Sequence, residues 1–296
     1  MKTNTTVHWG IRLGAVTLLA ASFALGGITS TSAAVIRVKG SDTMIQLASM
    51  WAEAYHKVKP SVQVDPNGGG TGTGFAALQN NTCDICDASR EIKPAESAKT
   101  KSVTGKDAKE FVVAYDALAV YAHPSNPIME ISVEELREIW AEGGSITSWD
   151  QVKPGMKGKI VLFGRQNNSG TYDYFREHIC GLTAEKKQRE FRPGISEMNG
   201  SAEVVENVAK TRLALGYSGM GYKTDKVNWL KVSHKKGEPG VEPGIDVARN
   251  GKYPIARKLY LYTAGEPTGD VKEYIEWILS PAGQNVVGQE GFVPLK

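Results

Sequence analysis

The sequence predicts an α/β protein of two lobes, each a mostly parallel sheet flanked by helices. Short runs rich in β-branched residues alternate with amphipathic helical stretches, starting with Val35–Lys39, Met44–His56, Val62–Asp65 and Phe75–Asn80. Such alternation of strand and helix is typical of parallel sheets. The chain has 296 residues, 41% of them hydrophobic, which is enough material for two separate cores.

The crossings between the lobes are expected at two strand-like runs. The first, Phe111–Tyr121, is long and apolar, and histidine and prolines follow it. The second, Ile255–Thr263, comes after a segment rich in glycine, proline and charge. We therefore predict that lobe one comprises residues 35–117 with 253–296, and that lobe two comprises residues 118–252.

Further elements of the two lobes are marked by local signals. Ser132 and Glu135 form a capping-box pattern at the start of a helix. Strands are expected at Lys159–Phe163 and Ala214–Ser218. The last helix, Val271–Leu279, should end there because a proline follows shortly and cannot continue the hydrogen-bond ladder.

Residues 1–34 have the pattern of a secretory signal peptide. Lys2 and Arg12 precede an uncharged apolar stretch, and small residues follow it. We expect cleavage near Ala33 or Ala34 and export to the periplasm. A retained membrane anchor is the alternative, but the apolar stretch falls short of the ~20 residues that span a bilayer.

The charge balance of the mature chain limits the classes of partner. Loss of Lys2 and Arg12 lowers the formal net charge from +3 to +1. A nearly neutral chain gives no indication of nucleic acid or of a membrane surface as partner. We expect a monomer that binds neither.

Four short segments place small and hydroxyl residues between a strand and the helix that follows it. They are Gly40–Thr43, Gly68–Gly74, Asp87–Arg90 and Arg165–Thr171. Helix starts expose backbone N–H groups with partial positive charge, so such turns can hold an anion. The last segment is the most specific, because it adds a guanidinium to hydroxyl and backbone donors. Each turn alone could also be a plain helix cap, a flexible loop or a surface arginine.

In this order and context, the four segments resemble the phosphate-binding proteins of the phosphate-specific (Pst) ABC transporters, within the type II periplasmic binding protein fold. The resemblance covers essentially the whole mature chain and implies a ligand cleft at the hinge between the lobes. It extends to four further segments, which we interpret as structural and not ligand-contacting. They are Leu215–Tyr222, Tyr253–Arg257, Leu259–Tyr262 and Gly291–Leu295.

The resemblance also implies which residues surround the bound anion. Each of them stands in a motif position that the family uses. They are Thr43 with the backbone of Met44, Thr71, Ser89, Arg165, Ser169, Gly170 and Thr171.

One position departs from part of that family. Some members have an aspartate after the serine of the third segment, where this chain has Arg90. A carboxylate acceptor lets a site demand a protonated ligand and reject sulfate, which has no proton to donate. Asp42 is the first candidate for this role and Asp87 the second, although both could simply cap local backbone. The added charge of Arg90 should favour dianions.

The implied function is high-affinity binding of inorganic phosphate by hinge closure and its delivery to an inner-membrane ABC permease with its ATPase complex. The main alternative is the same fold binding sulfate, molybdate or tungstate, against which Arg165 and Arg90 favour phosphate. A phosphate-sensing or interaction protein and a hydrolase are less favoured. The histidines have no triad or metal spacing, and the G-x-S-x-G motif is absent. We expect no catalytic residue, metal or cofactor.

Cys83 and Cys86 have the C-x-x-C spacing of a redox or metal pair. The remaining ligands of a zinc site are missing, so a disulfide is expected in an exported protein. The third cysteine, Cys180, leaves the pairing open.

Overall fold

The computed structural model describes residues 1–5, 34–167 and 169–296. Most of the predicted signal peptide, residues 6–33, lies outside the described residues. Ala33–Lys296 forms one compact unit. Among the residues described, no helix has the length and apolar character needed to cross a bilayer.

The strands follow the expected order along the chain. They are β1 (Ala34–Gly40), β2 (Val62–Asn67), β3 (Ile85–Ala88), β4 (Ala108–Ala122), β5 (Glu130–Ser132), β6 (Val161–Arg165), β7 (Ser196–Met198), β8 (Ala214–Gly219), β9 (Asn228–Trp229), β10 (Lys231–Ser233) and β11 (Ala256–Ala264).

The helices lie between and after these strands. The α-helices are α1 (Ile45–Val58), α2 (Thr71–Gln79), α3 (Pro94–Thr104), α4 (Val133–Trp140), α5 (Gly170–Phe175), α6 (Ser201–Lys210), α7 (Ile245–Arg249), α8 (Gly269–Leu279) and α9 (Pro281–Gln289). Short helices of other types are η1 (Trp149–Gln151), the π-helix η2 (Arg176–Cys180) and η3 (Met220–Tyr222).

One sheet runs through the whole unit in the order β2-β1-β3-β11-β4-β8-β6-β7, with β9 beside β4. At one end β1 is parallel to β2 and β3, and at the other end β6 is parallel to β7 and β8. Antiparallel β11 and β4 join these two parallel groups. The predicted α/β architecture is therefore confirmed, with the mostly parallel strand groups of the two halves joined into one sheet.

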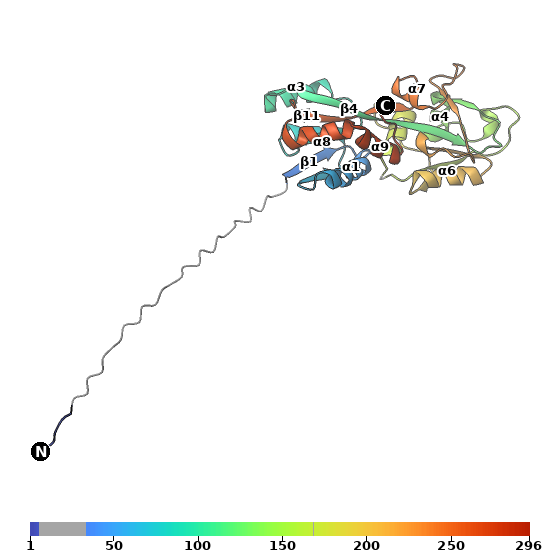
Figure 1. Cartoon of the computed structure of the whole chain (residues 1–296). Helices are drawn as coiled ribbons and strands as arrows, with labels where there is room; N and C mark the ends of the chain where they lie inside the picture. The colour runs from blue at the N-terminus through green and yellow to red at the C-terminus, as the bar shows by residue number, and fades with distance from the viewer. Residues whose placement is uncertain (6–33, 168) are drawn as a thin grey trace. The chain divides into compact units, whose positions relative to one another are not determined.

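Strand β4 connects the two groups without a break. Its first part pairs with β11, and Leu118–Ala122 pairs with β8. Figure 1 shows β4 running from the end that holds β1 to the end that holds α4 and α6. The apolar run Phe111–Tyr121 of the sequence thus lies within a single strand, and the connection between the two groups lies within its length.

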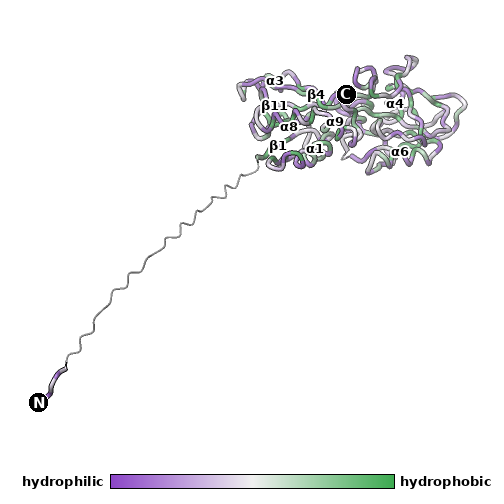
Figure 2. The backbone as a smooth tube through the Cα atoms, in the orientation of Figure 1, coloured by the Kyte–Doolittle hydropathy of each residue, from purple (hydrophilic) through white to green (hydrophobic). Residues whose placement is uncertain are grey.

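Apolar side chains form separate cores on the two sides of this connection. The first core is built on β1, β2, β3, α1, α8 and α9, and includes Trp51 and Leu259. The second core is built on the end of β4, α4, β6, β8 and α6, and includes Trp140 and Tyr217. In Figure 2 the hydrophobic segments follow these interior strands, while the outer loops are hydrophilic. Each fully buried large side chain stabilises the fold by about 1.5–3 kcal/mol.

The residues at which one core ends and the other begins can be compared with the predicted boundaries of the lobes. Ala114 packs in the first core and Ala117 in the second, and on the return Ile255 packs in the second core and Leu259 in the first. The division of the chain into lobes at residues 117/118 and 252/253 stays a prediction.

Aromatic side chains of the second core hold α5 in place. The rings of Phe175 and Tyr217 stack with centroids 3.8 Å apart, and the ring of Trp140 meets Tyr217 edge-on at 5.1 Å. Stacked and edge-on pairs add to the stability that burial alone provides. The start of α5 at Gly170 is thereby anchored from one side.

The predicted helix ends are largely confirmed. Ser132 Oγ accepts a hydrogen bond from the Glu135 N–H at 3.1 Å, and Glu135 Oε2 accepts one from the Ser132 N–H at 3.1 Å. This is the expected capping box at the start of α4. Helix α8 ends at Leu279 as expected, but the expectation that it is the last helix is wrong, because Pro281 is accepted in the first turn of a helix and begins α9.

Two helix starts differ from the sequence prediction. Helix α2 begins at Thr71, inside the expected glycine-rich turn, because Gly70 with φ +92° makes the turn by itself. Thr73 Oγ1 then donates to the Gly70 carbonyl at 2.8 Å. The helix that follows the fourth segment is α5, which begins at Gly170 inside that segment and is followed directly by η2.

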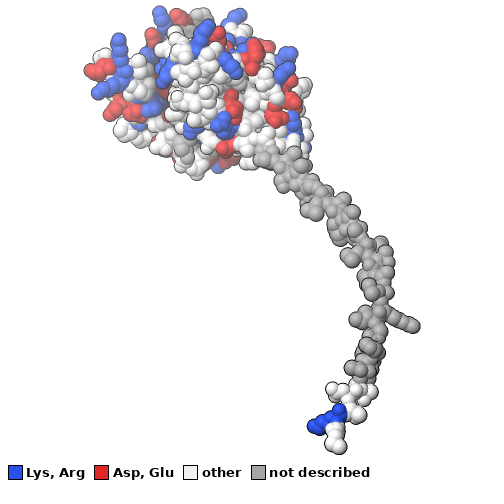
Figure 3. All heavy atoms as spheres, turned by 90° about the vertical axis from the view of Figure 1, so that its left-hand side faces the viewer, with Lys and Arg blue, Asp and Glu red and all other residues white. Residues whose placement is uncertain are grey.

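The surface in Figure 3 carries both signs of charge. Basic and acidic side chains are interspersed over the face shown, without a broad region of one sign. This distribution agrees with the small net charge of the chain.

The capping box gives a first testable prediction. Ser132→Ala should lower the free energy of unfolding by about 1 kcal/mol, because the Glu135 N–H loses its acceptor. Urea denaturation followed by circular dichroism measures this change. Ser102→Ala, on exposed α3, is the control and should stay within about 0.5 kcal/mol of the parent protein. An equal decrease in the free energy of unfolding in both variants would show that the Ser132 cap does not stabilise α4.

Candidate functional site

The turn between β1 and α1 is tied to the end of β3. The Ser41 N–H donates to the Asp87 carbonyl and to Asp87 Oδ1, both at 3.1 Å. Gly40 permits this closeness, because a Cβ there would lie 2.0 Å from the Asp87 carbonyl oxygen. Parallel β1 and β3 end at the same edge of the sheet, so their following turns meet there. Thr43 follows in this turn, partly exposed.

The start of α2 joins the turn after β3. Thr71 Oγ1 lies 3.3 Å from Ser89 Oγ and accepts a hydrogen bond from the Ser89 N–H at 3.2 Å. Asp42 is exposed, and its Oδ1 accepts a hydrogen bond from the Gly69 N–H at 2.7 Å. The first three predicted segments are therefore brought together at one edge of the sheet.

The fourth segment reaches the same place from the second core. Ser169 Oγ caps α5 by accepting a hydrogen bond from the Thr171 N–H at 3.2 Å. Thr43 Oγ1 donates to the Gly170 carbonyl at 3.5 Å, and a Cβ on Gly170 would lie 2.1 Å from Thr43 Cα. Only glycine at position 170 permits this approach, so the Thr43 turn and the Gly170 turn are in direct contact.

Arg165 lies at the end of β6, beside the Gly170 turn. Its Nη1 donates to Ser201 Oγ at 2.7 Å and its Nη2 donates to the Asn199 carbonyl at 3.2 Å. Burial lowers the pKa of Arg165. Within the part of the chain that the structure describes, Nε has no hydrogen-bond partner and no carboxylate forms an ion pair with the guanidinium. Its positive charge is thus available to an anion.

The predicted residues line two neighbouring cavities instead of one. The turn cavity, of about 270 Å³, is lined by Ser41, Asp42, Thr43, Gly70, Thr71, Gly72, Ser89, Arg90, Asp173, Glu177 and Arg257. The Arg165 cavity, of about 160 Å³, is lined by Asp116, Leu118, Arg165, Thr171, Gly200, Ser201, Gly219, Tyr222, Glu290, Gly291 and Phe292. In this structure, where Thr43 contacts the Gly170 turn, the predicted residues are thus divided between two cavities.

Three of the predicted residues line neither cavity. Met44 is fully buried, and its N–H donates to the Ser41 carbonyl at 3.0 Å. Ser169 and Gly170 are also buried, at the contact between the two turns. Their place in the structure is next to the cavities and not on their walls.

Arg90 faces the turn cavity, but its charge is already paired. Its two terminal nitrogens each donate to Glu96 at 2.8 Å, in the two-pronged geometry that suits a carboxylate. The guanidinium also lies 5.5 Å from the centre of the Phe75 ring. The pairing with Glu96 reduces the extra positive charge that the sequence suggested for this site.

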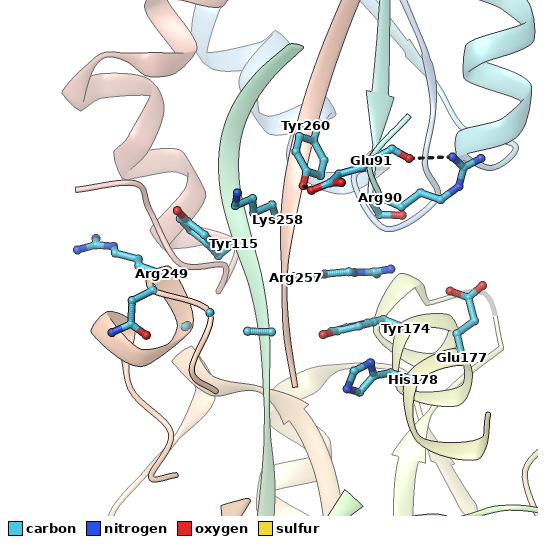
Figure 4. Close-up of a pocket in the computed structure, with 15 residues that line it drawn as sticks. Arg90, Glu91, Tyr115, Tyr174, Glu177, His178, Arg249, Arg257, Lys258 and Tyr260 are labelled. Atoms are coloured by element: carbon cyan, nitrogen blue, oxygen red, sulfur yellow. Dashed lines mark hydrogen bonds between the residues drawn. The ribbon is translucent and has the colours of Figure 1, made fainter. Parts of the chain in front are cut away.

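Arg257 belongs to the site, although its segment was expected to be structural. Its Nη2 donates to Thr43 Oγ1 at 3.0 Å, and its Nε donates to Asp116 Oδ2 at 3.1 Å. The guanidinium lies over the Tyr174 ring, 3.9 Å from its centre, and the two side chains run side by side in Figure 4. The interpretation of Tyr253–Arg257 as structural alone is therefore wrong for Arg257.

Two acidic residues of the site were also missed. Asp173 and Glu177 lie four residues apart at α5 and η2, and both line the turn cavity. Burial raises the pKa of Asp173. Their spacing after Thr171 puts both on one helix face, which is a signal that the sequence offered.

The cysteines do not form the expected disulfide. Cys83, Cys86 and Cys180 are all free and buried. Cys83 Sγ lies 3.9 Å from the Gly74 carbonyl and Cys86 Sγ lies 3.7 Å from the Asp87 carbonyl, while Cys180 packs in the second core. Burial raises the pKa of Cys83 to about 12, so its reactive thiolate form is disfavoured. No cluster of three or more His, Cys, Asp or Glu among the described residues could hold a metal ion.

Donors that meet between two cores are typical of proteins that bind small ligands between two halves. A family model described as the PBP superfamily domain matches residues 27–282. The phosphate-binding protein PstS of Pseudomonas aeruginosa is 34% identical over 270 residues, covering 86% of this chain and 81% of that protein. This chain therefore belongs to the PstS family of the PBP superfamily.

Solved structures agree with this assignment. A possible phosphate binding protein from Planctomyces limnophilus superposes with a TM-score of 0.77 at 31% identity, covering 89% of this chain and 94% of that chain. A structure from Clostridium perfringens with bound phosphate, assigned to a phosphate ABC transporter, superposes with a TM-score of 0.61 at 26% identity. It covers 88% of this chain and 100% of that chain.

The contact between the two turns predicts the effect of a small substitution. Gly170→Ala should lower the free energy of unfolding by about 1–3 kcal/mol, because the added methyl group forces Thr43 and α5 apart. The midpoint of urea denaturation measures this loss. Gly288→Ala is the control, since its added Cβ would have its nearest neighbour at 3.7 Å and should not destabilise. An unchanged midpoint for Gly170→Ala would show that the turns do not touch.

Asp87 predicts a dependence of stability on pH. Burial raises its pKa to about 7. The pKa of an aspartate in an unfolded chain is about 3.9. Between these values the folded state binds more protons, so stability falls as pH rises from about 4 to about 7, by at most about 1.4 kcal/mol per pH unit. Asp87→Asn keeps an acceptor for Ser41 and should weaken this slope.

The slope is measured by urea denaturation at several pH values between 4 and 7, the window set by the Asp87 pKa. Asp225→Asn, at an exposed position, is the control and should keep the slope of the parent protein. If the free energy of unfolding changes with pH by the same amount in Asp87→Asn and in the parent protein, Asp87 does not titrate in this range.

Proposed function

We propose that this protein binds inorganic phosphate in the periplasm and delivers it to an inner-membrane ABC permease and its ATPase complex. The observation that carries the proposal is the contact between the Thr43 turn and the Gly170 turn, with Arg165 on one side and Arg257 on the other. Backbone and hydroxyl donors together with guanidinium groups suit a small tetrahedral anion. The names of the family members reported above support phosphate as that anion.

Capture takes place by hinge closure. β4 and β11 connect the two cores, and the Thr43 turn and the Gly170 turn belong to different cores. Small rotations within these strands would open the space between the turns, admit phosphate and exchange its water for fixed donors. Because the ligand stabilises the closed form, the permease can distinguish loaded from empty protein by shape.

Selectivity for phosphate over sulfate requires a hydrogen-bond acceptor, because only phosphate carries a proton to donate. Asp87 accepts from Ser41 and lines neither cavity, so it is poorly placed for this role. Asp42 lines the turn cavity but already accepts from Gly69. Asp173 and Glu177 line the same cavity from the opposite side and join Asp42 as acceptor candidates.

Binding is favoured over catalysis. The hydrolase alternative needs a serine activated by a histidine, but the Ser89 hydroxyl is paired with Thr71 and the Ser169 hydroxyl caps α5. Neither serine has a hydrogen bond to histidine among the residues described. The alternative of another oxyanion, such as sulfate or molybdate, is addressed by direct titration.

Calorimetric titration of the mature protein tests the proposal. Phosphate and arsenate should bind, while sulfate and molybdate should barely register. Arg165→Ala should weaken phosphate binding by about 30-fold or more, as for loss of one partner of a buried charge pair. Thr71→Val should weaken it by about fivefold, as for loss of one neutral donor.

The matched control is Arg212→Ala, which removes the same charge at an exposed position outside both cavities. It should leave the dissociation constant unchanged. Equal binding of sulfate would contradict the assignment to phosphate but not the binding of an oxyanion. Failure of every anion to bind would contradict the proposed function itself.

A further inference from the structure

A third and larger cavity, of about 670 Å³, lies beside the turn cavity. It is bounded by the start of β11, the end of α7 with the residues that follow it, the Ser89 turn, and α5 with η2. Tyr115, Tyr174 and Tyr260 line it, as Figure 4 shows, and we call it the tyrosine cavity. β3 ends at Ala88, which pairs with Tyr260, so the edge of β11 before Tyr260 is not covered by β3.

The tyrosine cavity and the turn cavity share part of their walls. Ser89, Arg90, Glu177 and Arg257 line both. A ligand held in the turn cavity can therefore extend past these shared residues into the larger space. The contact between Thr43 and Gly170 is already formed in this structure, and the tyrosine cavity stays open beside it.

The part of the tyrosine cavity away from the shared wall carries unpaired positive charge. Arg90 is paired with Glu96 and Arg257 with Asp116. Lys258 and Arg249, in contrast, have no ion pair within the described residues, and Arg249 Nε donates only to the Pro294 carbonyl at 2.8 Å.

Lys258 has a second polar neighbour on the same sheet. It lies directly opposite Tyr115 in the antiparallel pairing of β11 with β4. Directly opposite side chains lie close together, so an ammonium and a phenol are presented side by side. The Tyr115 hydroxyl is not engaged in any hydrogen bond within the described residues, and it can donate to an anion as Lys258 can.

Two carboxylates, those of Glu91 and Glu177, also line this cavity. Glu91 accepts a hydrogen bond from the Tyr260 hydroxyl at 3.1 Å, so it is engaged with the wall. Glu177 is exposed and lies on the shared wall. A partly protonated phosphate chain would offer Glu177 a hydrogen-bond donor at that point.

We propose that the tyrosine cavity is a second anion subsite, which allows the protein to bind linear condensed phosphates such as pyrophosphate and tripolyphosphate. One phosphoryl group occupies the turn cavity, and the chain extends toward Lys258 and Tyr115. The inference rests on the proposed function for the first phosphoryl group. An ester of a neutral alcohol would leave Lys258 and Arg249 without an acceptor, so a second phosphoryl group suits this wall better.

The test compares orthophosphate, pyrophosphate and tripolyphosphate in calorimetric titrations of the mature protein. A condensed phosphate should bind, and orthophosphate should displace it because both use the turn cavity. Lys258→Ala should weaken binding of the condensed phosphate by about fivefold, the upper range for a pair that stays partly in water. Tyr115→Phe should also weaken binding of the condensed phosphate. Orthophosphate binding should change by less than about twofold in both variants.

Lys109→Ala is the matched control, since it removes the same charge from β4 at a position outside the three cavities. It should change neither affinity. The inference is wrong if no condensed phosphate binds, or if Lys258→Ala weakens orthophosphate and condensed phosphates equally. If orthophosphate binds and condensed phosphates do not, the inference is wrong and the proposed function stands. If neither orthophosphate nor a condensed phosphate binds, the inference and the proposed function are both wrong.

Discussion

The interactions of Arg257 hold together the parts of the molecule that form the site. From β11 its guanidinium reaches Asp116 on β4, the hydroxyl of Thr43 next to the first core and the ring of Tyr174 in the second core. Asp116 is almost completely buried, and burial raises its pKa even with Arg257 beside it. Removing the guanidinium would leave a buried carboxylate without its partner, which is far more unfavourable than losing an exposed pair. The geometry of both turns therefore depends on this one side chain.

The sheet determines why so many donors meet at this point. β1 and β3 are parallel and end at the same edge, and the Ser41 N–H is tied to Asp87 across that edge. β6 approaches from the other parallel group and ends at Arg165, just before the Gly170 turn. Helix starts follow both edges, so backbone donors from two separate cores lie close to each other where the two turns touch. The order of strands brings these residues to the same region, where Arg257 connects them.

Much of this arrangement could be predicted from the sequence because local rules govern it. Alternation of strand and helix, the capping box at Ser132 and the stop after Leu279 depend on residues close in the chain. The four turns were found because the same pattern of small and hydroxyl residues between a strand and a helix occurs four times along the chain. Arg257 was missed because nothing within its own segment indicates that its partners are Thr43 and Asp116, which are distant in sequence. The pairing of Arg90 with Glu96 depends likewise on the path of the chain between them, and the free thiols depend on packing around Gly74.

The return of β11 to the first core has a consequence for how the chain acquires its structure. β11 inserts between β3 and β4, and α8 and α9 supply further side chains to the same core from the last part of the sequence. The amino-terminal half of that core cannot close until almost the entire polypeptide has been synthesised. Contacts between such distant residues slow folding. During synthesis the second core, built mostly from residues that precede β11, can therefore form before the first core, which is complete only once α8 and α9 have been made.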